Sequence, residues 1–124
     1  MKSTGPDQAT VLAVWLRSQH QCERCGKGLL WDTRGWLWSI QHRKARAMGG
    51  SKAPGINGPA NLAVLCGHAT TPGGCHQWVE SHPTAAAVEG WRLFQLEEAD
   101  VVPIKHHRGW VRLTTDGSYV EVAA

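Results

Sequence analysis

The stretch "NLAVLCGHATTPGGCHQWVE", residues 61–80, contains three kinds of local sequence and decides the fold of the chain. Residues 62–65 are apolar throughout, which predicts a short buried strand. The segment "GHATTPGG" that follows Cys66 is richer in glycine, threonine and proline than a helix or strand tolerates, so we expect a loop. A helix should begin at Cys75 or His76 and continue to about residue 82, where Pro83 ends it or starts a second turn that extends to Val88.

Four cysteines frame this stretch in two pairs. Cys66 and Cys75 bracket the loop, and a C-x-x-C lies upstream in "QCERCGKG", residues 21–28. In a reducing compartment this arrangement favours zinc over disulfides, and a four-thiolate zinc site contributes directly to folding. Eight residues separate Cys66 from Cys75, which departs from C-x-x-C spacing. Two alternatives therefore remain: His68 or His20 replaces one of the ligands, or the cysteines form two pairs of free thiols. The predicted structural zinc ligands are Cys22, Cys25, Cys66 and Cys75.

Length and composition indicate one small domain, since 124 residues are 42% hydrophobic and 19% charged. No apolar run approaches the roughly 20 residues of a membrane span, and the N-terminus lacks a signal-peptide apolar region. We therefore expect a cytoplasmic protein with no membrane partner. The net charge is only +3, but residues 33–79 contain no Asp or Glu while keeping five cations. Such a segment suits a polyanion such as nucleic acid, and a solvated basic loop is the alternative.

The remaining pattern predicts an α+β fold. Asp7 is suited to cap a helix that extends to about Ser18, and residues 29–31 and 36–42 have the pattern of two short strands. The segment from Arg43 to Ala60 should be an irregular loop, because glycine and proline recur in it.

The C-terminal part has a different pattern. "WRLFQL", residues 91–96, is a strand candidate, and residues 110–122 alternate around Asp116-Gly117, which is a strong hairpin signal. We expect residues 1–90 to form a zinc-stabilised core and residues 91–124 to form a β-rich extension packed on it.

Taken in order, His42, Asn61-Leu62, Cys66 and "CHQWVE" at residues 75–80 resemble the HNH endonucleases, the ββα-metal nucleases. The fuller string "HRKARAMGGS … NGPANLAVLCG … GCHQWVESHP" is similar to small HNH proteins of actinobacterial phages and their hosts. The resemblance covers residue 22 to about residue 90. It implies a DNA endonuclease that uses Mg²⁺, Mn²⁺ or another divalent cation, located in the host cytoplasm if phage-encoded, with phage packaging proteins as further candidate partners.

The resemblance also assigns roles within the site. His42 matches the general base, His76 a catalytic-metal ligand, and Asn61 a residue that holds the ring of the base or touches the metal. Glu80 follows His76 by four residues, so both side chains should project from one helix face and share the metal. Taken singly, His76 is more commonly a capping or core histidine, and Asn61 a turn residue.

One position departs from the family pattern. The residue before the base is usually Asp or His and binds the metal, whereas here it is Gln41, whose neutral amide is a poorer ligand. Either Glu80 supplies the missing charge, or metal affinity is low, or catalysis has decayed. The expected contacts to the DNA backbone are Arg43, Lys44, Arg46 and Lys52.

These observations favour a metal-dependent DNA endonuclease of weak sequence specificity. Two rival functions are a zinc-containing module that binds DNA without cutting it, and a phage packaging accessory protein that docks through its β-rich extension.

Overall fold

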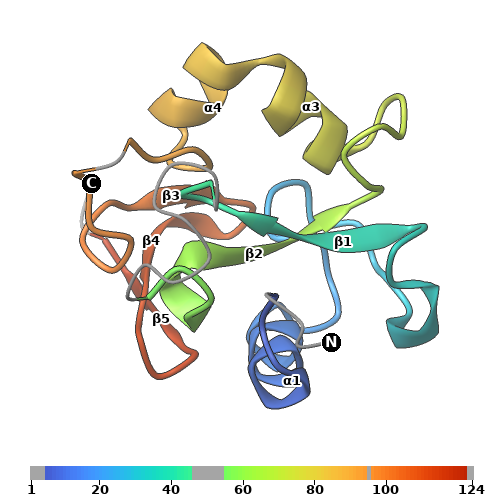
Figure 1. Ribbon diagram of the computed structural model, residues 1–124, viewed down its shortest axis with the longest axis horizontal. Coiled ribbons are helices and arrows are strands. Elements are labelled where there is room, and N and C mark those ends of the chain that lie inside the picture. The colour runs from blue at the N-terminus through green and yellow to red at the C-terminus, as the bar shows by residue number, and fades with distance from the viewer. Residues whose placement is uncertain (1–4, 46–54, 95, 123–124) are drawn as a thin grey trace.

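The computed structural model describes residues 5–45, 55–94 and 96–122 and has a mixed α+β architecture (Figure 1). The helices are α1 (Gln8–Arg17), α3 (Cys75–Ser81) and α4 (Pro83–Val88), with 3₁₀ turns η1 (Trp31–Thr33) and η2 (Pro59–Asn61). The strands are β1 (Trp38–His42), β2 (Leu62–Cys66), β3 (Ile104–His106), β4 (Gly109–Leu113) and β5 (Tyr119–Glu121). The α+β class expected from the sequence is therefore confirmed. None of the helices formed by the described residues is long and apolar enough to cross a membrane.

Helix α1 forms where the sequence predicted it. The Asp7 carboxylate accepts a hydrogen bond from the Thr10 amide at 2.8 Å and caps the first turn. Its apolar stripe buries Val11, Val14 and Trp15. The Trp15 ring stacks on Trp38 with 4.6 Å between ring centroids, so this helix packs against the first strand.

Strands β1 and β2 form an antiparallel pair that runs from Trp38 opposite Cys66 to His42 opposite Leu62. Every residue of β2 is buried, as its apolar sequence predicted. Helices α1 and α3 both contact β2, and Figure 1 shows α1 on one side of the pair with α3 and α4 on the other. Since successive side chains of a strand point to opposite faces, Trp38 faces α1 while Ser39 and Gln41 project toward the side of α3.

The C-terminal strands form a separate antiparallel sheet of order β3-β4-β5. The hairpin expected around Asp116-Gly117 is present as β4 and β5. The inward residues Ile104, Val111 and Leu113 belong to the same buried hydrophobic cluster as Trp38. The C-terminal extension therefore shares one core with the rest of the chain.

Two predicted strands are wrong. Instead of a strand at residues 29–31, the chain turns at η1, where the Thr33 hydroxyl donates to the Leu30 carbonyl at 2.8 Å. Burial alternates from Trp91 to Phe94, but the Trp91 amide donates to Ala86 and the Leu93 amide to Arg43 rather than to a neighbouring strand. Residue 95 lies outside the described residues.

A buried ion pair joins the N-terminal segments to β2. Arg17 donates to both carboxylate oxygens of Glu23, at 3.1 and 2.6 Å, and also to the carbonyls of Pro59 and Leu62. Burial alone would raise the pKa of Glu23, but the charge of Arg17, the His106 ring at 3.5 Å, and hydrogen bonds from Arg17 and the Val64 amide lower it to about 2. The buried Glu23 carboxylate is therefore ionised and hydrogen-bonded, as a buried charge requires.

Arg43 joins the end of β1 to η2 and to the segments that precede β3. Its side chain donates to the carbonyls of Gly90, Ala60, Ala99 and Val102 at 2.6–3.0 Å, and the residue is only 1% exposed. Burial lowers its pKa to about 10, which leaves the guanidinium charged at neutral pH. The expectation that Arg43 contacts a DNA phosphate is therefore wrong, because none of its donors reaches the surface.

Replacing Arg43 by alanine should unfold the domain or lower its free energy of unfolding by about 3–5 kcal/mol. Several buried carbonyls would be left without a donor, at about 1–3 kcal/mol each. Chemical denaturation followed by circular dichroism measures the change. Arg34→Ala, an exposed cation of the same acid-free segment, is the control and should change stability little. A stable Arg43→Ala protein with weakened DNA binding would restore the phosphate role.

Candidate metal centre and adjoining histidine site

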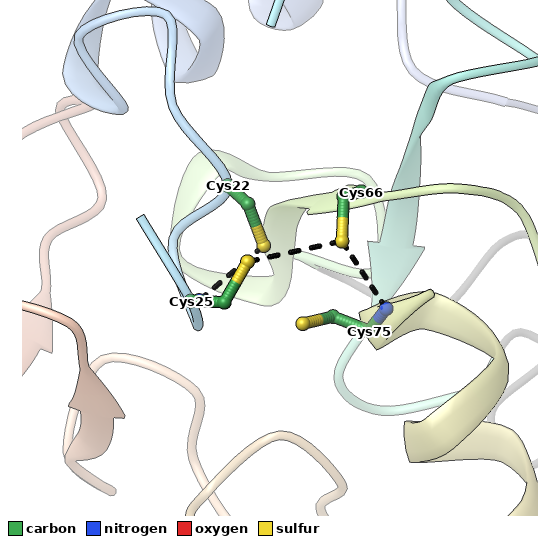
Figure 2. A group of neighbouring side chains, drawn as sticks. All are labelled: Cys22, Cys25, Cys66 and Cys75. Carbon is green, nitrogen blue, oxygen red and sulfur yellow. Dashed lines mark hydrogen bonds between the residues drawn. The ribbon is translucent and has the colours of Figure 1, made fainter. Parts of the chain in front are cut away.

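Four cysteine sulfurs come together at one point of the fold (Figure 2). The sulfurs of Cys22, Cys25, Cys66 and Cys75 all lie within 4.8 Å of one another, with Cys25 exposed and the other three buried. They come from the C-x-x-C turn, the end of β2 and the start of α3. The grouping expected from the sequence is confirmed, and these residues can hold a metal ion.

The backbone around the sulfurs is shaped to accept negative charge. The Cys25 amide points at the Cys22 sulfur at 3.5 Å, and the Cys75 amide points at the Cys66 sulfur at 3.3 Å. Gly74 is required for this approach, since a Cβ there would lie 3.0 Å from the Cys66 carbonyl oxygen. Thiols of Cys22 and Cys75, together with the Cys75 amide, lower the pKa of Cys66, whereas the neighbouring sulfurs raise the pKa of Cys22. Adjacent thiolates thus oppose one another unless a cation joins them.

The two histidines considered as replacement ligands have other partners. The His20 ring stacks on Trp15 with 4.9 Å between centroids. His68 accepts a hydrogen bond from the Thr70 amide at 3.3 Å. Within residues 5–45, 55–94 and 96–122, the cysteine cluster is the one group of three or more His, Cys, Asp and Glu side chains with metal-binding spacing.

Arg24 lies beside the sulfurs and was not identified from the sequence. Its guanidinium donates to the Cys75 sulfur at 3.5 Å and to Glu89 at 3.0 Å, and it lies 3.7 Å from the centre of the Trp78 ring. The sequence did contain a signal for this contact: Arg24 lies between the two cysteines of "CERC", and this position places its cation next to their sulfurs. Arg24 therefore connects the C-x-x-C turn to α3 and balances part of the thiolate charge.

His76 is fixed by a hydrogen-bond chain from β1. The Ser39 hydroxyl lies 2.6 Å from the Gly67 carbonyl and 2.5 Å from His76 Nδ1. Because the hydroxyl hydrogen goes to the carbonyl, Nδ1 is the donor and Nε2 carries the lone pair. Burial lowers the pKa of His76, with the nearby His68 and His42 adding to the effect and Glu80 opposing it, which favours the neutral ring that a metal needs.

Glu80 faces His76, as the i, i+4 spacing predicted. The two acceptors, His76 Nε2 and Glu80 Oε1, are 3.7 Å apart. The other carboxylate oxygen of Glu80 accepts a hydrogen bond from Arg92 at 3.3 Å. Two acceptors that face each other without a hydrogen between them leave a position suited to a cation.

Gln41 contributes a third acceptor on this side of the sheet. The residue is 2% exposed and its amide nitrogen donates to the His42 carbonyl at 2.8 Å. Its Oε1 is buried and has no hydrogen-bond partner among the described residues. Gln41 shares a strand face with Ser39, which contacts His76. A buried acceptor without a donor is costly, so this oxygen also suits a cation.

His42 lies at the end of β1 and its ring is held by a residue that sequence reasoning missed. Its Nε2 donates to the Asn57 side-chain oxygen at 2.8 Å. Asn61, which was expected to hold this ring or touch the metal, does not contact the ring, and its role toward a metal stays a prediction. Its side chain instead bonds the Lys44 amide and carbonyl and the Ile56 carbonyl, at 2.7–3.1 Å. Asn61 thus fixes the backbone that follows His42. The contact between Asn57 and the His42 ring had only the turn-forming dipeptide Asn57-Gly58 as a local sign in the sequence.

The remaining cations of the predicted DNA loop are only partly described. Lys44 is half-buried and lines a cavity of about 220 Å³ together with Glu98 and Thr115. Arg46 and Lys52 lie outside the described residues. The phosphate role of these three lysine and arginine residues stays a prediction.

Comparison with protein-family models, curated proteins and solved structures finds no match to this chain.

Arg24→Ala should weaken the affinity of the cysteine cluster for Zn²⁺ by about 10–100-fold, the usual effect of removing a group that supports metal ligands. Transfer of Zn²⁺ to a chromogenic chelator measures the change, and Arg24→Lys should give an intermediate value. Arg92→Ala is a matched control, because its side chain is 26% exposed against 24% for Arg24 and also pairs with a glutamate. Equal Zn²⁺ retention in Arg24→Ala and wild type would contradict the role of Arg24.

Proposed function

We propose that this protein is a divalent-metal-dependent DNA endonuclease of the HNH type, with a structural zinc ion at the cysteine cluster. The observation that carries the proposal is the set of acceptors on one side of a β-β-α unit. The orphaned amide oxygen of Gln41 shares a strand face with Ser39, whose hydroxyl contacts His76, and Glu80 faces His76. The order of these elements agrees with the family that the sequence resembles.

The residues of this set fit a divalent cation. Gln41 offers an oxygen, His76 a neutral nitrogen with an oriented lone pair, and Glu80 a carboxylate. When bound, such a cation would stabilise charge on the phosphate and on the leaving oxygen. Ser39 supports the set by keeping His76 in the tautomer that presents Nε2.

His42 has the geometry of a general base. The hydrogen bond from Nε2 to Asn57 orients the ring, and a neutral His42 with its proton on Nε2 would accept a proton from water at Nδ1. The contacts of Asn61 fix the chain on the C-terminal side of His42. Asn57 is therefore a positioning residue for the base, in the way that the third member of a catalytic triad orients its histidine.

A zinc ion at the cysteines would act on the fold rather than on the reaction. Four thiolates in a closed tetrahedral set leave no position for a water molecule, which is typical of structural zinc. Because Cys75 directly precedes His76, the ion would also set where α3 begins and where His76 lies.

One observation favours a second function, DNA binding without cleavage. Glu80 is engaged by Arg92 at 3.3 Å, and Gln41 is neutral, so the acceptors supply little net negative charge for a cation. The cleavage assay below separates the two functions.

Wild-type protein should nick supercoiled plasmid when Mn²⁺ or Mg²⁺ is added, and His42→Ala should lower the rate by about 10²–10⁴-fold, the usual contribution of a general base. DNA binding and the melting temperature should be unchanged, since only the base is removed. His82→Ala, an exposed histidine near the end of α3, is the matched control and should nick like wild type.

A second pair of variants tests the metal ligands in the same assay. Gln41→Asp should lower the Mn²⁺ concentration needed for half-maximal nicking, because it adds an anionic ligand, and Glu80→Gln should raise it. Equal nicking by wild type and His42→Ala would assign the cleavage to a contaminant and leave DNA binding as the function.

A further inference from the structure

The outer face of the β3-β4-β5 sheet carries an exposed tryptophan between two cations. In the register of the sheet, Lys105 lies opposite Trp110, and Arg112 lies opposite Val120. These residues are exposed, whereas Ile104, Val111 and Leu113 on the other face are buried. Residues opposite each other in an antiparallel pair point to the same face, so Lys105 and Trp110 are side by side.

The charged residues at the strand positions of this face have one sign, and the Arg112 guanidinium also donates to the Asp100 backbone carbonyl at 3.3 Å. At the register positions above, the described residues are two cations, a tryptophan and a valine, with no carboxylate. Glu121 lies opposite the inward-facing Val111 and so belongs to the other face. In the turn between β4 and β5, the Asp116 carboxylate is engaged by Thr114 and Ser118. The face therefore attracts anions, and the ring of Trp110, in a residue that is 41% exposed, is open for stacking.

A polar cleft continues this face at Lys105. It has a volume of about 330 Å³ and is lined by Arg24, Glu89, Lys105, His106 and His107. The Glu89 carboxylate is already taken by Arg24 and by the Trp91 indole, both at 3.0 Å. His107 Nε2 is buried and has no hydrogen-bond partner among the described residues. The cleft therefore borders Lys105, the residue that lies opposite Trp110, and the Arg24 guanidinium in its wall is already paired with Glu89.

We propose that this outer face, with Lys105, Trp110 and Arg112 at its centre, binds single-stranded nucleic acid. Phosphates would pair with the two cations and an unpaired base would stack on Trp110, which is how sequence-tolerant single-strand sites work. Base pairs of a duplex cannot offer a free ring face to the tryptophan, so a single strand fits the face better. The inference does not rest on the proposed nuclease activity, since it uses none of the residues of the histidine site.

The test is fluorescence anisotropy with a labelled oligothymidylate and the full chain, without added Mg²⁺ or Mn²⁺ so that cleavage does not interfere. Trp110→Ala should raise Kd by about tenfold or more, and Trp110→Phe should restore most of the affinity, because the ring can still stack. Lys105→Ala with Arg112→Ala should lower the slope of log Kd against log salt by about 1.4, at about 0.7 for each phosphate that the protein no longer neutralises.

Arg34→Ala and Trp36→Ala provide matched controls. They remove an exposed cation and an exposed tryptophan from the segment before β1, which lies across the molecule from the β3-β4-β5 sheet (Figure 1). These variants should bind like wild type, and circular dichroism should show that all variants are folded.

Three results would overturn the proposal: unchanged binding in Trp110→Ala, an equal loss of affinity in the control variants, or tighter binding of a duplex of the same sequence. Polyglutamate that competes as well as oligothymidylate would mean a general anion surface instead. Failure of the nuclease proposal is seen separately, because the nicking assay with His42→Ala is read whether or not this face binds a single strand.

Discussion

The cysteine cluster is the constraint on which the rest of the structure depends. It brings together the C-x-x-C turn, the end of β2 and the start of α3, with all four sulfurs within 4.8 Å of one another. Since Cys66 and Cys75 are the last residue of β2 and the first residue of α3, the cluster fixes how the helix leaves the sheet. The adjacent His76 is placed by the same geometry, and its contact with Ser39 shows that α3 lies close against β1. One local constraint thus orders both the fold and the candidate active site.

Two buried guanidinium groups, those of Arg17 and Arg43, add further links between distant segments. Arg43 belongs to the segment 33–79 that contains no Asp or Glu. Arg17 pairs with Glu23 and reaches two carbonyls, while Arg43 binds four carbonyls from separate parts of the chain. Within the acid-free segment 33–79, the Arg43 cation therefore serves as an internal donor rather than as a contact for a polyanion. On the outer face of β3 and β4, the exposed cations Lys105 and Arg112 flank Trp110.

Local signals predicted the parts of the structure that depend on local chemistry. The Asp7 cap, the buried strand at β2, the Asp116-Gly117 hairpin and the grouping of the cysteines all followed from spacing and residue type. Contacts between distant segments were not predictable in this way. Asn57 reaches His42 across 15 residues, and Arg24 reaches Cys75 across 51, so no periodicity reports them. The wrong strand prediction at 91–96 has the same origin, because Trp91 and Leu93 belong to an irregular segment whose amides bond Arg43 and α4.

The central claim is that the cysteine cluster positions a second metal site formed by Gln41, His76 and Glu80. The most direct measurement is anomalous diffraction from crystals of the wild-type protein soaked in Mn²⁺, recorded on both sides of the zinc absorption edge. The account predicts a zinc peak among the four sulfurs and a separate manganese peak in coordinating contact with the Gln41 side-chain oxygen and His76 Nε2. A zinc peak at the cysteines with no manganese at Gln41 and His76 would contradict the claim.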